Sequence, residues 1–135
     1  MAVVYSTTLK NNRMQLVADL VAGKTAGSSV GSATAGTLVI GTSSLSGATG
    51  ILVSFTLGTT PGTVSSGVLT ISGTPLTATA SGTGTAAKAE LRDNAGNVIV
   101  SGLTVGTSAS DIIINATAIS SGQSVTLSSG SITHG

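Results

Sequence analysis

From residue 37 to the C-terminus, short apolar runs alternate with clusters of glycine, serine, threonine and proline. There are eight such runs: 37–42, 50–57, 67–72, 76–81, 85–92, 97–105, 111–116 and 124–133. Runs of this length that recur about every 8–12 residues are typical of strands in an antiparallel sandwich or barrel. The gaps between them are too short for crossover helices, so a parallel sheet is not expected. The pattern therefore predicts a mainly β fold of about eight antiparallel strands.

The pattern is different at the N-terminal end, where apolar residues recur at steps of three and four. Such steps place side chains on one side of a helix, so we predict a single α-helix at about 8–22 with one apolar stripe. A hydroxyl of Ser6, Thr7 or Thr8 can cap its first turn, and Gly23 can end it. The stripe consists of Leu9, Met14, Leu16, Val17, Leu20 and Val21.

The helix separates two segments of different character. Ahead of it, residues 2–5 read Ala-Val-Val-Tyr and predict an extended apolar arm. Behind it, residues 23–36 consist mostly of small residues, which offer little apolar area to offset backbone ordering and indicate a linker or long loop. We therefore divide the chain into 1–36, holding the arm, the helix and a Gly/Ser/Thr-rich linker, and 37–135, the β-sandwich domain.

The arm and the helix hold the candidate interface residues. An exposed apolar arm is unfavourable in water unless it packs on something. It can form an edge strand on its own sheet, or add as a strand or anchor to a neighbouring subunit. The leucines of the helical stripe are expected to dock on the sandwich or on a neighbouring chain. The candidate residues are Val3, Val4, Tyr5, Leu9, Leu16 and Leu20.

Residues 86–100 give the clearest β-hairpin. Ala87, Ala89 and Leu91 alternate with Lys88, Glu90 and Arg92, which predicts one apolar and one charged face. Residues 93–97 supply the turn, with Gly96 suited to a positive φ. A second turn is predicted at 120–123, before the last strand.

Charge and composition exclude several classes of function. Charged residues make up 7% of the chain and the net charge is +1, which cannot supply the phosphate contacts of a nucleic-acid-binding protein. With one Tyr, one Phe and no Trp, the chain has no platform on which bases could stack. No apolar run approaches the length of a membrane span, and the N-terminus lacks the basic start of a signal peptide. We expect no nucleic-acid or membrane partner.

No arrangement of residues in the sequence points to catalysis, a cofactor or a metal. There is no cysteine, and the single histidine, His134, stands next to the C-terminal residue, where chains are usually mobile. The four carboxylates are expected at a helix, a charged strand face, a turn and a strand entry: Asp19, Glu90, Asp93 and Asp111. Threonines follow no fixed repeat, so a flat ice-binding ladder is not expected. We predict that the protein is not an enzyme.

Both ends of the chain carry a family resemblance. The segments YSTTLKNNRMQLVADLVAG (5–23) and AELRDNAGNVIVSGLTVGTSASDIIINATAISSGQSVTLSSGSITHG (89–135) resemble small tailed-bacteriophage proteins of the capsid cement, or decoration, type. The linker and the central strands match poorly, and the matching segments hold no catalytic motif. The resemblance implies a jelly-roll-like pair of antiparallel sheets, the major capsid protein as partner, and a homodimer at local two-fold positions on the shell.

The expected function is therefore that of a structural virion protein on the outer surface of the capsid. Such a protein would stabilise the shell by bridging major capsid subunits, and its many copies would add modest contacts together. The alternative is a phage tail or fibre component that binds a host receptor. A sugar-binding fibre tip usually carries aromatic residues, and this chain has only Tyr5 and Phe55.

Overall fold

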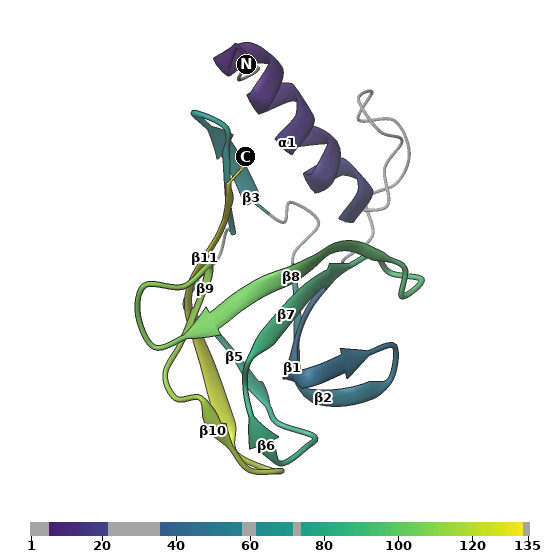
Figure 1. Cartoon of the computed structure of the whole chain (residues 1–135), viewed down its shortest axis with the longest axis vertical. Helices are drawn as coiled ribbons and strands as arrows, with labels where there is room; N and C mark the ends of the chain where they lie inside the picture. The colour runs from purple at the N-terminus through teal and green to yellow at the C-terminus, as the bar shows by residue number, and fades with distance from the viewer. Residues whose placement is uncertain (1–5, 22–35, 58–61, 72–73, 134–135) are drawn as a thin grey trace.

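The computed structural model describes residues 6–21, 36–57, 62–71 and 74–133. These residues form one helix, α1 (Thr7–Val21), and eleven strands (Figure 1). Each of the eight predicted runs contains a strand, and three short strands, β3, β6 and β10, are additional. The strands are β1 (Thr37–Ser46), β2 (Thr49–Thr56), β3 (Gly62–Ser65), β4 (Val68–Ile71), β5 (Leu76–Thr79), β6 (Gly84–Thr85), β7 (Lys88–Arg92), β8 (Val98–Gly106), β9 (Ile112–Ile114), β10 (Ala118–Ile119) and β11 (Ser124–Thr133).

The strands form a β-sandwich, as the sequence predicted. One layer has the order β2-β1-β7-β8, and the other contains β9, β11, β4 and β3, with β5 also paired to β11. Figure 1 shows the two layers facing each other, with α1 and β3 at one end of the molecule and the β6–β10 pair at the other. The mainly β class and the single N-terminal helix are confirmed.

The layers are joined on both sides. On one side β8 and β9 pair in parallel, through Val105 with Ile112 and Gly106 with Ile113. All other strand pairs in the described part of the chain are antiparallel, so the fold contains no parallel sheet, as expected, but it does contain this one parallel strand pair. A five-residue loop suffices here, because only two residue pairs are made. On the other side, the backbone N–H groups of Ser81 and Gly82 donate to the carbonyl of Leu52 in β2, at 2.8 and 3.2 Å.

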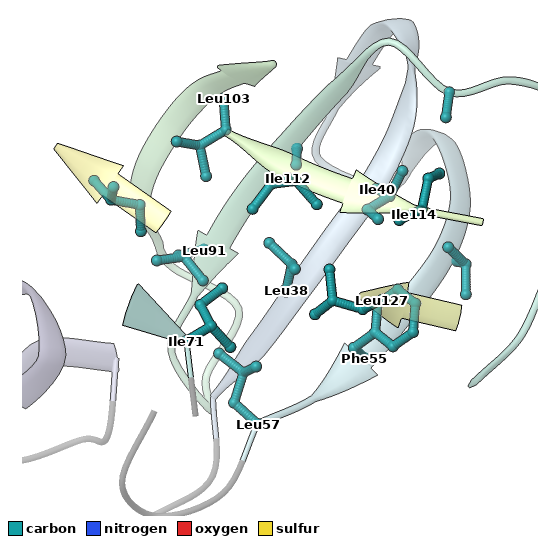
Figure 2. Packing of buried hydrophobic residues seen from close by; sticks show 14 of the residues in the cluster. Leu38, Ile40, Phe55, Leu57, Ile71, Leu91, Leu103, Ile112, Ile114 and Leu127 are labelled. Carbon is teal, nitrogen blue, oxygen red and sulfur yellow. The ribbon is translucent and has the colours of Figure 1, made fainter. Parts of the chain in front are cut away.

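A single apolar core fills the space between the layers. Leu38 and Ile40 of β1 pack in one buried cluster with Ile112 of β9 and Leu127 of β11. Phe55 of β2 belongs to the same cluster (Figure 2). All five side chains are at most 1% exposed. Burying a Leu, Ile or Phe side chain is worth about 1.5–3 kcal/mol. This core of aliphatic residues and one aromatic residue therefore supplies the main stabilising term of the fold.

Helix α1 begins at Thr7 and ends at Val21, one residue earlier at each end than predicted. The Ser6 hydroxyl accepts a hydrogen bond from the Leu9 N–H at 3.2 Å, which confirms Ser6 as one of the expected caps. The prediction of one apolar stripe was wrong, because its residues are divided between a buried side and an exposed side of the helix. Met14, Ala18 and Val21 join the core, whereas the leucines at 9, 16 and 20 lie on the opposite side.

The β7–β8 hairpin forms as predicted, and the charged side chains of Glu90 and Arg92 share one face of β7. The structure adds that both side chains are buried, because each residue is only 9% exposed. Arg92 donates from Nε and Nη2 to Glu90 Oε2 at 3.0 and 2.7 Å, and from Nη2 to the Gly47 carbonyl at 2.8 Å. Gly47 lies in the β1–β2 turn, so this turn reaches the face of the sheet that carries the ion pair. The charges are buried because they satisfy each other and a backbone carbonyl.

Both predicted turns are present. Gly96 has φ +90° in the 93–97 turn, and Gly122 has φ +87° in the 120–123 turn. The Asn97 side chain donates to Asp93 Oδ2 at 3.0 Å and the Asn97 backbone N–H donates to Oδ1 at 2.9 Å. The bond from the Asn97 side chain, followed by the one from its backbone, holds the pKa of Asp93 below its ordinary value.

Candidate protein interface

The side of α1 that faces away from the core is apolar. Leu9, Leu16 and Leu20 are 42%, 36% and 41% exposed, and their spacing of seven and four residues places them on one side of the helix. We call these three residues the leucine face. In the described part of the chain, the remaining exposed large hydrophobic residue is Val98 of β8, at 47%. Three exposed leucines in a row on a helix resemble the anchors of a helix that binds a groove.

The helix that carries the leucine face is held firmly on its other side. Asn11 Oδ1 accepts a hydrogen bond from the Gly67 N–H at 2.7 Å, in the β3–β4 turn. That turn has φ +51° at Ser66 and +75° at Gly67, the geometry of a two-residue hairpin turn with both φ values positive. The opposite end of the helix is anchored by Val21, which is fully buried. The leucine face is therefore presented by a helix with fixed position.

The predicted interface residues have different outcomes. Val3, Val4 and Tyr5 lie outside the described residues, as does the 23–35 part of the predicted linker. The leucine face does not dock on the sandwich of its own chain, which was one of the two expected destinations. Docking of the leucine face on a neighbouring chain, the other expected destination, stays a prediction. His134 also lies outside the described residues.

A second surface lies on the layer that contains β3, β4, β5 and β11. The outward side chains of β3, β4, β5 and β11 are mostly hydroxyls, and no charged residue occurs in these four strands. Pairing brings them into rows that cross the sheet, with Thr63 beside Thr70 and Thr70 beside Ser131. Two further rows join β5 to β11. We call this surface the hydroxyl face; it consists of Thr63, Thr70, Thr77, Thr79, Ser124, Thr126 and Ser131.

The rows could have been anticipated only in part. Thr77 and Thr79 alternate with apolar neighbours, and so do Ser124 and Thr126, which indicates that each pair shares one face of its strand. The cross-strand register, which places Ser124 beside Thr79 and Thr126 beside Thr77, comes from long-range pairing. No local signal in the sequence specifies that pairing.

The carboxylates are placed apart and have structural partners. Asp19 accepts a hydrogen bond from the Gln15 side chain at 3.1 Å, and Glu90 pairs with Arg92. Asp111 Oδ2 accepts from both the N–H and the hydroxyl of Thr104, each at 3.1 Å, which fastens the loop between β8 and β9. Among the described residues, no three His, Cys, Asp or Glu side chains lie close enough to hold a metal ion.

The helix found in the described part of the chain is neither long nor apolar enough to cross a membrane.

The fold and its surfaces thus define a β-sandwich with a terminal helix and an exposed apolar side on that helix. Comparison with protein-family models, with curated proteins and with solved structures finds no match to this chain.

Proposed function

We propose that this protein is a capsid cement, or decoration, protein of a tailed bacteriophage. It binds the outside of the head and stabilises the shell by bridging major capsid subunits, with self-association as a homodimer on the shell. The proposal starts from the resemblance of residues 5–23 and 89–135 to phage head proteins of this type. The observation that carries it is the leucine face, an apolar surface on a helix whose other side is fixed in the core.

The leucine face has the right size for a contact that acts in many copies. Complete burial of a leucine side chain is worth about 1.5–3 kcal/mol, and each of these side chains is roughly two-fifths exposed. Covering all three therefore contributes about 3 kcal/mol per copy. Such a contact is weak alone but sufficient on a lattice, where neighbouring contacts add through multivalency.

The hydroxyl face supports the same role. A surface without charged residues can be placed close to neighbouring copies without repulsion, and its hydroxyls can exchange hydrogen bonds with different partners. Covering it requires no charge to leave water, which is the most costly step in burying a polar surface. A crowded protein shell is an environment in which these properties are useful.

Imaging of the parent particle tests the proposal. Particles of the phage that encodes this chain, with a gold label on the C-terminus of the protein, should carry label at regular spacing over the entire head. Label confined to the tail would reject the cement function and favour a tail or fibre component. A particle without label would reject both virion functions.

A further inference from the structure

Strand β3 ends the sheet with one open edge. It pairs with β4 through Gly62–Ile71, Thr63–Thr70, Val64–Leu69 and Ser65–Val68, and no other strand of the described residues pairs with it. At the other end of the same path, the Leu52 carbonyl of β2 accepts hydrogen bonds from the backbone of Ser81 and Gly82. An uncovered strand edge presents unpaired backbone groups and is a ready acceptor for another strand.

The hairpin register identifies the backbone groups at this edge. Ser65 and Val68 flank a two-residue turn, so they form a pair whose N–H and C=O groups point at each other. The groups alternate along an antiparallel pair, and those of Gly62 and Val64 therefore point away from β4. Neither strand of the hairpin contains a charged residue or a proline, the usual features that block an edge.

Helix α1, which follows the N-terminal arm in the sequence, has its first turns beside the β3–β4 hairpin. Residues 1–5 lie outside the described residues, but they join the chain at Ser6, at the start of α1. Asn11 lies at the β3–β4 turn, and Ser6 precedes it by five residues, or about 7.5 Å of helix. Figure 1 shows the first turn of α1 extending past the end of β3. Ser6, the residue to which the arm is joined, therefore lies beyond the hairpin, on the side away from the sandwich.

This position favours the β3 edge of a different copy. To reach Val64 of its own chain, the arm would have to turn back at Ser6 and run alongside the helix towards the hairpin. The distance from Ser6 to Val64 along this path is about 14 Å, made up of about 7.5 Å of helix and two strand residues of about 3.3 Å each. Five extended residues span about 17 Å at most, so about one residue would remain to pair. In a neighbouring copy all of residues 2–5 can pair, and valine and tyrosine are among the strongest strand formers.

We propose that residues 2–5 of one copy add as a β-strand to the open edge of β3 in a neighbouring copy. This inference rests on the proposed function for its setting and names the contact by which copies associate. The arm hydrogen-bonds to Gly62 and Val64, and its side chains alternate between the core side and the hydroxyl face. Thr63 then lies opposite an arm residue in a pair without mutual hydrogen bonds, where Cα atoms are about 4.5 Å apart, within the range for a disulfide.

Cross-linking between two single-cysteine variants tests this contact, because the natural chain contains no cysteine. Val4→Cys with one affinity tag and Thr63→Cys with another are mixed as free protein and oxidised. We expect at least fivefold more doubly tagged product than from Val4→Cys mixed with Ser54→Cys, an exposed position on β2. Val3→Cys and Tyr5→Cys are tested in the same way to allow for register. Unchanged thermal unfolding of Thr63→Cys verifies that the hairpin is intact.

Two results would overturn the inference. Equal yields from the Thr63 and Ser54 mixtures at all three arm positions would show that the arm does not select β3. A disulfide that closes within a single Val4→Cys/Thr63→Cys chain, without product from the mixed single variants, would place the arm on its own copy. The cross-link is measured in solution, so its failure leaves the shell-labelling result untouched, and a missing shell label leaves the cross-link standing.

Discussion

Replacing Arg92 with methionine should lower the free energy of unfolding by about 3–5 kcal/mol, because it leaves Glu90 buried without its cation. Both groups are 9% exposed, and Arg92 also binds the Gly47 carbonyl, which loses its donor at the same time. For a domain of this size the loss corresponds to about 10–15 °C in melting temperature. Thermal and denaturant unfolding of the purified protein measure it.

The matched control is the double variant Glu90→Leu/Arg92→Met. Removing both charges eliminates the uncompensated carboxylate, and replacement of a buried ion pair by apolar residues of similar volume is often neutral or stabilising. We expect the double variant to recover most of the loss. If Arg92→Met alone unfolds within about 1 kcal/mol of the natural protein, the ion pair does not hold the β1–β2 turn against β7.

Changing the leucine face should have its effect on binding and not on folding. In the triple variant Leu9→Ser/Leu16→Ser/Leu20→Ser, about 3 kcal/mol of apolar burial is lost at the interface, which is roughly a 100-fold loss of affinity. The three side chains already contact water in the free protein, so melting should change little. Titration of purified protein onto shells that lack it measures the affinity.

Val98→Ser provides a control of the same chemistry. Val98 is more exposed than any residue of the leucine face, but it lies on β8 and not on the outer side of α1. Its substitution should leave shell binding unchanged. If the triple variant binds shells as tightly as the natural protein does, the leucine face is not part of the contact. The cement function would still stand, because the natural protein binds.

The sequence predicted the elements because their signals are local. Strand alternation, the Ser6 cap and the glycines at 96 and 122 each depend on a few neighbouring residues, and all are present in the structure. The three additional strands are short and lack such signals. β6 and β10 contain two residues each and exist only because they pair with each other.

The errors have a different cause, namely which of two faces becomes buried. Periodicity placed six apolar residues on one side of α1, but only the side near the β3–β4 hairpin finds a partner, so the leucines remain outside. Likewise, alternation correctly separated Glu90 and Arg92 from Ala89 and Leu91. It could not reveal that the β1–β2 turn, more than forty residues earlier, places Gly47 against Arg92.

Of the two candidate interface surfaces, the leucine face could be predicted from local sequence, whereas the arrangement of the hydroxyl face could not. Leu9, Leu16 and Leu20 were predicted from the sequence as interface residues. They were chosen as part of a six-residue stripe, whose other members the structure places on a different side of the helix. The hydroxyl face depends on the register between β5, β11, β4 and β3, which joins residues as far apart in sequence as Thr70 and Ser131. No pattern within one strand contains that information.

The most direct test of the proposed function is the temperature at which particles release their genome, measured with and without this protein. A ligand that binds only the assembled shell stabilises it by about 2.7 kcal/mol per site at a hundredfold excess over its dissociation constant. Particles that lack the protein should therefore assemble but release DNA at a lower temperature, and added purified protein should restore the natural value. An unchanged release temperature, together with failure of the particles to adsorb to host cells, would contradict the cement function and support a tail or fibre component.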